Sequence, residues 1–231
     1  ANLCSCMSSY SIMPVLPLYL MDELHCQTNI MGLALAVFPF VALLFRPVSG
    51  IITDLFNRKY VLLISTLCCA VLFPAILAAT GIMLFMLIRL LHGASFSSMA
   101  SSQVTMTVAF LPQCKLGTGI GIYSSTLSLG MILGPMMGLF VADTFSYASA
   151  FWVPFTFALT GVLLLLFIRT PVRHGIKPKK FSRDMFFMKD GLWPLLALLL
   201  AAFMNGMIVN YVSVLARDLD LEAYASLYFL L

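Results

Sequence analysis

Charged side chains are scarce in this sequence of 231 residues. They make up 10% of the chain, and hydrophobic residues make up 61%, whereas soluble domains carry about 25% charged residues. A water-soluble fold would therefore have too few charges to cover its surface. Apolar runs longer than the ~20 residues that a helix needs to cross a bilayer recur along the chain, and the ~10-residue alternating segments of a transmembrane β-barrel are missing. The sequence predicts an all-α polytopic membrane protein embedded in a lipid bilayer.

Signatures of enzymes and cofactor sites are also missing. The chain has no H-E-x-x-H, no G-x-S-x-G and no Walker loop, and no basic cluster of the kind that binds nucleic acid outside 177–180. We interpret 177–180 as part of a solvated linker rather than as a binding site for anionic lipid. The six cysteines are Cys4, Cys6, Cys26, Cys68, Cys69 and Cys114. Most of them fall in apolar runs, so we expect no disulfide framework, and Cys68-Cys69 lacks nearby His or acidic ligands for a metal or redox site. We expect no catalytic residue, metal, cofactor or nucleic-acid partner.

Apolar runs and breaks divide the chain into seven spanning segments and part of an eighth. The expected spans are 1–21, 29–53, 60–79, 82–109, 118–141, 149–168 and 191–214, with 224–231 opening an eighth. The polar segment 169–190 separates the first six from the rest. We therefore expect a six-helix bundle over 1–168, a basic linker, and the start of a second bundle over 191–231. Because the chain starts at Ala1 and ends at Leu231 inside apolar runs, we expect a fragment of a longer protein.

Lysines and arginines give the orientation, because cytoplasmic loops carry an excess of them. If the spans alternate, eleven basic residues share one side with the N-terminus, and only Arg217 lies on the other side. The eleven are Arg46, Arg58, Lys59, Lys115, Arg169, Arg173, Lys177, Lys179, Lys180, Arg183 and Lys189. The N-terminus and the segment 169–190 are therefore expected in the cytoplasm.

The charged loop between the second and third expected spans is the most specific feature of the chain. Gly50 is followed by Asp54 and then by Arg58 and Lys59, with Arg46 before them; these five residues are called the loop motif below. Gly50 lets another helix approach closely. Asp54 can stabilise the positive N-terminal end of a neighbouring helix, and Arg58 can pair with it. The spacing indicates a very short loop at the membrane boundary.

An arginine lies inside the fourth expected span. Arg89 is about seven residues from the start of that span, or roughly 10 Å at 1.5 Å per residue. Such a position costs at least ~2.5 kcal/mol on insertion scales and normally faces a cavity or a partner. No Asp or Glu lies deep in any expected span, so its partner is missing sequence, a backbone carbonyl or a substrate anion. His92 lies three residues after Arg89 and is followed by Gly93. Its imidazole either titrates near neutral pH or only forms a hydrogen bond.

Small residues recur at every fourth position of the fifth expected span. Gly130, Gly134 and Gly138, with Pro135 inside the same run, are called the glycine motif below. Glycines at this spacing let helices pack at short distance, and a proline removes one backbone hydrogen bond and kinks the helix.

Taken together, these features resemble the major facilitator superfamily, whose members are two six-helix halves around a central site. The loop motif resembles the family's G-x-x-x-D-x-x-x-R-[RK], with Asn57 where glycine is usual, and the resemblance implies that it latches the cytoplasmic ends of the two halves together. Residues 89–93 resemble R-x-x-Q-G, with His92 in place of glutamine, which implies a proton-coupling role for Arg89. The glycine motif resembles G-x-x-x-G-P-x-x-G-G, with Leu139 in place of the last glycine. The family shows this motif mainly in exporters that exchange substrate for protons.

The resemblance implies a secondary transporter, not an enzyme, that exports a drug or sugar-like small molecule in exchange for protons by alternating access. A proton-linked or facilitative importer of a small metabolite and a non-transporting membrane sensor are the alternatives. We expect the full-length protein to be a monomer in a plasma membrane, the bacterial inner membrane. Helices 1, 4 and 7 line the central cavity in the family, which makes Tyr19, Gln103, Asn205 and Asn210 candidates for contacts with the substrate.

Overall fold

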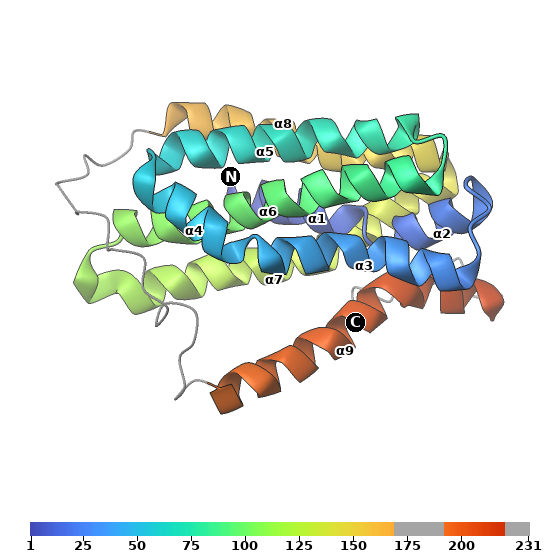
Figure 1. Ribbon diagram of the computed structural model, residues 1–231. Coiled ribbons are helices and arrows are strands. Elements are labelled where there is room, and N and C mark those ends of the chain that lie inside the picture. The colour runs from blue at the N-terminus through green and yellow to red at the C-terminus, as the bar shows by residue number, and fades with distance from the viewer. Residues whose placement is uncertain (169–191, 220–231) are drawn as a thin grey trace.

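The computed structural model describes residues 1–168 and 192–219, and this part of the chain is built from helices without strands. The helices are α1 (Asn2–Ser11), α2 (Val15–Asp22), α3 (Thr28–Leu44), α4 (Arg46–Leu55), α5 (Arg58–Ala75), α6 (Ile82–Phe110), α7 (Leu116–Thr144), α8 (Tyr147–Phe167) and α9 (Leu192–Asp218). Short 3-10 turns, η1 (Ile76–Ala78) and η2 (Gln113–Lys115), extend α5 and precede α7. Figure 1 shows the helices up to α8 side by side in one bundle, which α9 approaches at one end.

Within the described ranges, five helical segments are long and apolar enough to cross a membrane, and a sixth is added if α3 and α4 count as one bent span. The five are Asn2–Asp22, Arg58–Ala78, Ile82–Phe110, Gln113–Thr144 and Tyr147–Phe167. These bounds confirm the first six expected spans to within a few residues, and α9 covers the seventh. The segments 169–190 and 224–231 lie outside the described residues, so the division into two bundles and a linker stays a prediction.

Two of the expected spans are broken, which the apolar pattern did not reveal. The first is interrupted between α1 and α2, and Pro14 lies immediately before α2. The second bends by 45° between α3 and α4, and Pro47 lies in the first turn of α4. A proline is tolerated in a first turn because its missing N–H would have no intrahelical partner there. By contrast, α7 continues through Pro135.

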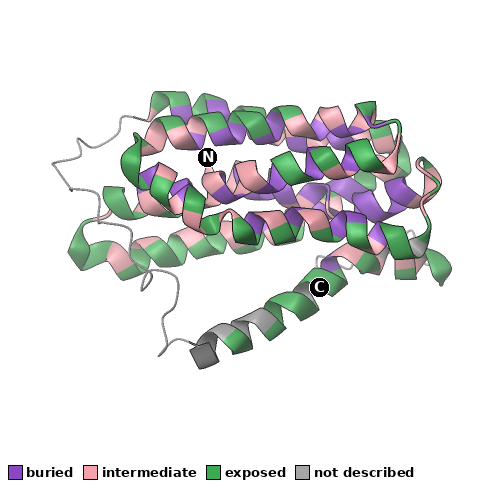
Figure 2. Cartoon of the chain, viewed as in Figure 1, coloured by how far each residue is buried: buried purple, intermediate pink, exposed green. Residues whose placement is uncertain are grey.

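Buried and exposed residues are separated as in a protein surrounded by lipid. Phe73, Phe85 and Phe151 are completely buried, and Figure 2 shows the buried residues on the inward faces of the helices. Large apolar side chains such as Phe40, 63% exposed, lie on the outer surface. Because water would make such a surface costly, these faces fit an apolar surrounding.

Candidate functional site

Arg89 is enclosed between α6 and α3. It is the eighth residue of α6 and only 4% exposed. Its guanidinium carbon lies 4.3 Å from the centre of the Phe38 ring, within the range of a cation–π interaction, and its Nη1 lies 3.3 Å from Nδ1 of His92. Its Nε has no hydrogen-bond partner in the part of the chain that the structure describes. Arg89 is therefore a buried cation held by an aromatic ring and an imidazole.

The contact with Arg89 determines which nitrogen of His92 carries the proton. A guanidinium only donates hydrogen bonds, so Nδ1 of His92 accepts and the proton lies on Nε2. The imidazole packs edge-on against Phe73, 4.6 Å between ring centres, and lies 5.0 Å from the Phe38 ring. A second proton on Nδ1 would remove the acceptor and place another positive charge beside Arg89. We call Arg89, His92, Phe38 and Phe73 the arginine cluster.

Gly93 brings α3 close enough to α6 to complete the arginine cluster. A Cβ placed on Gly93 would lie 2.6 Å from the carbonyl oxygen of Phe38 and 3.2 Å from the backbone nitrogen of Ala42. Both contacts are with backbone atoms, which cannot move aside as a flexible side chain can. The missing side chain of Gly93 therefore sets the distance at which the Phe38 ring meets Arg89.

The loop motif lies at the end of α4, which a row of hydroxyl groups holds against α6. Oγ of Ser49 is 3.2 Å from Oγ of Ser97 and 3.0 Å from Oγ of Ser101. One turn further along α4, Oγ1 of Thr53 is 2.9 Å from Oγ of Ser102. Such interhelical hydrogen bonds stabilise helix pairs in lipid by about 0.6 kcal/mol each. This row was not predicted from the sequence, although small hydroxyl residues four positions apart on both helices were a signal for it.

Lys59 of the loop motif binds the end of another helix. Nζ of Lys59 donates to the carbonyl oxygens of Leu166 and Ile168, at 3.1 and 2.7 Å. These carbonyls lie at the C-terminal end of α8, where a positive charge is favourable. On the other side of the turn, Asn57 accepts a hydrogen bond from the backbone N–H of Lys59 at 3.0 Å and caps the N-terminus of α5. Lys59 therefore joins the α4–α5 turn to α8.

The other members of the loop motif have different surroundings. Nη1 of Arg58 donates to the carbonyl oxygen of Thr105 at 3.3 Å, while Arg46 and Asp54 are exposed. No atom of the described residues lies within 4 Å of a Cβ placed on Gly50. The sequence predicted that another helix approaches Gly50 closely, but no helix of the described residues does so.

The glycine motif brings the backbones of α7 and α1 into contact. A Cβ on Gly134 would lie 3.1 Å from the backbone nitrogen of Ser11, and one on Gly138 would overlap the carbonyl oxygen of Ser11. One on Gly130 would collide with Cβ of Cys6. All three glycines are buried. The spacing by four therefore produces the close packing that the sequence suggested.

The three candidates for contacts with a substrate whose side chains the structure describes lie on three different helices, α2, α6 and α9. Tyr19 is 6% exposed and packs edge-on against Phe151, with ring centres 4.9 Å apart. Gln103 is buried in α6, and its Nε2 has no partner among the described residues. Nδ2 of Asn210 donates to a carbonyl one turn earlier in α9, at 2.7 Å. The side chain of Asn205 lies outside the described part. Their place in a substrate cavity stays a prediction.

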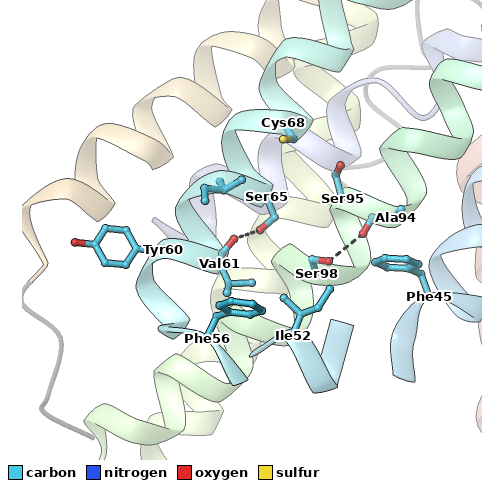
Figure 3. A pocket seen from close by; sticks show the side chains of 11 residues that line it. Phe45, Ile52, Phe56, Tyr60, Val61, Ser65, Cys68, Ala94, Ser95 and Ser98 are labelled. Carbon is cyan, nitrogen blue, oxygen red and sulfur yellow. Dashed lines mark hydrogen bonds between the residues drawn. The ribbon is translucent and has the colours of Figure 1, made fainter. Parts of the chain in front are cut away.

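An apolar groove of about 420 Å³ lies between α4, α5 and α6. Figure 3 shows Phe56, Tyr60, Ser65 and Ser98 among the side chains that line it. The hydroxyls of Ser65 and Ser98 donate to carbonyls in their own helices, at 2.7 and 3.2 Å. The groove therefore offers few partners to a polar solute and is a weaker candidate than the arginine cluster.

The described residues contain no group of three or more His, Cys, Asp or Glu side chains that could hold a metal ion. The six cysteines are free thiols, of which Cys69 is buried and Cys68 is exposed.

Comparison with known proteins places the chain among membrane carriers. A family model described as Major Facilitator Superfamily matches residues 1–231. The chain is 26% identical over 174 residues to the multi-drug resistance efflux pump PmrA of Streptococcus pneumoniae, covering 74% of this chain and 43% of that protein. It is 29% identical over 198 residues to multidrug resistance protein 1 of Bacillus subtilis, covering 83% and 50%. It is 29% identical over 176 residues to the quinolone resistance protein NorA of Staphylococcus aureus, covering 76% and 43%. The chain thus spans about half the length of these relatives or less.

Solved structures share the fold at low sequence identity. The structure described as the in meso crystal structure of the POT family transporter PepTSo has a TM-score of 0.67 and 14% identity, covering 99% of this chain and 50% of that one. An auto inhibited POT family peptide transporter has a TM-score of 0.66 and 14% identity, covering 97% and 50%. This likeness concerns the arrangement of the helices alone.

Proposed function

Because the chain belongs to the major facilitator superfamily, a family of multi-pass membrane proteins, we propose that the whole protein is a transporter that exports a small molecule in exchange for protons. Relatives named multi-drug efflux pumps support export of a drug-like molecule. The close packing of the glycine motif supports exchange for protons, because the family shows this motif mainly in such exporters. The location proposed is the bacterial inner membrane, with the N-terminus in the cytoplasm.

The arginine cluster is the observation that carries this proposal. An ionised group taken out of water is costly unless it is paired, and in the described residues Arg89 has an imidazole and a ring but no carboxylate partner. A carboxylate of the second bundle, or an anionic group on the substrate, would complete its coordination. Proton uptake or release at such a partner changes the charge beside Arg89, which gives protons a means of shifting the equilibrium between two conformations.

The loop motif supports the proposed alternating access. In the transporter fold, two bundles rock about a central site. The surface of α4 that carries Gly50 and the exposed Asp54 has room for a helix of the second bundle, while the hydroxyl row on a neighbouring face fixes α4 to α6. The first bundle then presents α4 to the second bundle without moving it relative to α6.

Inside-out vesicles that contain the full-length protein test the proposal. We expect uptake of a fluoroquinolone or of ethidium when the vesicle interior is made acidic, and loss of uptake when a protonophore collapses the gradient. A sodium gradient of equal size serves as the control and should drive no uptake. Uptake that ignores the pH gradient would contradict proton exchange. Uptake only in right-side-out vesicles would indicate an importer, and absence of any movement would indicate the sensor.

The structure favours a hydrogen-bonding role for His92 over titration of its own ring, which leads to a specific prediction. His92→Gln should keep proton-driven uptake, because a glutamine oxygen can accept from Arg89. His92→Phe should lower it roughly tenfold or more, because a hydrogen bond to a charged group contributes about 1.5–3 kcal/mol. His25→Asn is the control, because His25 is exposed and asparagine also adopts the φ of 46° found there. We expect this variant to show wild-type uptake. Equal losses in His92→Gln and His92→Phe would show that the imidazole itself must titrate.

A further inference from the structure

One carboxylate joins three helices at the end of α2. Asp22, the last residue of α2, accepts a hydrogen bond of 2.5 Å from the hydroxyl of Tyr147, the first residue of α8. It also accepts from Nη1 of Arg217, which lies 2.7 Å from each of its two oxygens, near the end of α9. Of these contacts, the one with Tyr147 lies within the six-helix bundle and the one with Arg217 connects the bundle to α9. We call these three residues the Asp22 triad.

The Asp22 triad lies where α9 meets the bundle. Val214 and Ala216 of α9 pack against the hydrophobic core, and the hydroxyl of Tyr211 lies 3.6 Å from a Cβ placed on Gly32 of α3. The residues of α9 from 200 to 204 are exposed, and Phe203 is 63% exposed. Figure 1 shows the same arrangement, with α9 diverging from the bundle away from α2. Among the described side chains of α9, contact with the bundle thus lies toward the end that carries the Asp22 triad.

From this geometry we propose that the Asp22 triad is a gate, which holds α9 against the six-helix bundle at the membrane face opposite the loop motif. The ion pair is partly open to water, because the side chains of Arg217 and Asp22 are 41% and 29% exposed. Water-accessible ion pairs contribute little and break readily, as a contact must if it is to open in each cycle. Tyr147 restrains the carboxylate before Arg217 arrives, which reduces the entropy lost when the pair forms. In the described structure this gate is closed.

The charge pattern places the gate on the non-cytoplasmic side. Under the proposed orientation, α9 is closed against the bundle outside and diverges from it toward the cytoplasm, so the structure corresponds to an inward-facing state. The role of the gate in transport rests on the proposed function. The contact itself, and its effect on the separation of α9 from α2, do not.

Spin labels on either side of the Asp22 triad test the gate in the full-length protein reconstituted in lipid. Glu23 and Leu219 are exposed and flank the pair, and p-acetylphenylalanine at both positions accepts nitroxides without disturbing the native cysteines. Dipolar broadening of the spectrum then reports the fraction of molecules with a short label distance. Asp22→Asn keeps a partner for Tyr147 but removes the charge. We expect it to lower the ratio of closed to open molecules roughly fivefold, the upper end of what an exposed ion pair contributes.

A charge swap and a matched control make the result specific. Asp22→Arg combined with Arg217→Asp should recover much of the short-distance fraction that either single change loses. Asp218→Asn removes an acid next to Arg217 and should leave the ratio at the wild-type value. Any of three results would overturn the proposed gate. These are an unchanged ratio in Asp22→Asn, a charge swap that recovers no more than the single variants, and a loss in Asp218→Asn equal to that in Asp22→Asn. If the protein passes this test but does not export in exchange for protons, the proposed gate stands and the proposed function is wrong.

Discussion

Arg89→Met is expected to abolish proton-driven uptake while the protein unfolds at the same temperature as wild type or a higher one. Methionine is long, flexible and apolar, so it can fill the space under the Phe38 ring. The change removes a cation that is 4% exposed and whose Nε lacks a partner in the described residues. Replacing buried charged groups by apolar residues of similar volume is often neutral or stabilising by about 1–4 kcal/mol. The acceptor left on His92 costs about 1–3 kcal/mol and offsets part of that gain.

Two measurements on the same preparation separate the roles of Arg89. Uptake in inside-out vesicles reports coupling, and thermal unfolding in detergent, followed by far-ultraviolet circular dichroism, reports stability. Lys115→Met, which removes an exposed cation at the turn before α7, is the control and should leave both unchanged. Proton exchange at the wild-type rate in Arg89→Met would show that the proposed coupling role is wrong. A fall of the unfolding temperature would instead assign Arg89 to the structure.

Gly138→Ala is expected to destabilise the protein by about 1–3 kcal/mol or more, the range for overpacked cores. The added methyl group would occupy the position of the Ser11 carbonyl oxygen. Because that oxygen belongs to the backbone of α1, the methyl group can be accommodated only if α1 and α7 separate. Separation would also loosen the contacts at Gly134 and Gly130, which depend on the same distance. Thermal unfolding in detergent measures the loss.

The same helix supplies a control for Gly138→Ala. Gly121 lies in α7 with no atom of the described residues within 4 Å of an added Cβ. Gly121→Ala should be neutral or stabilising by up to about 1 kcal/mol, because alanine favours a helix over glycine. If both variants unfolded at the wild-type temperature, close packing between α1 and α7 would not be needed for stability.

The positions of the spans were predictable from the sequence because lipid imposes a minimum apolar length on each of them. The breaks were not, since a proline pattern alone does not distinguish Pro47, where α4 begins, from Pro135, through which α7 continues. The ends of the helices could be predicted from the apolar runs, whereas the bends within the spans could not.

At the candidate site, the sequence identified Arg89 and His92 but not the rings around them. Phe38 and Phe73 are two of 19 phenylalanines, and no local pattern indicates which of them meets a cation on another helix. The pair of Asp22 and Arg217 is a similar case. The charge pattern put both on the same side of the membrane, but their contact depends on how α9 lies against α2, over a separation of 195 residues.

The two hydrogen bonds of Lys59 connect segments more than 100 residues apart in the sequence. They fasten the last turn of α8 and the following Ile168 to the turn between α4 and α5. Because these hydrogen bonds join the two segments, a displacement of the end of α8 is transmitted to the α4–α5 turn. Lys59 thus links the position of the end of α8 to that of the loop motif.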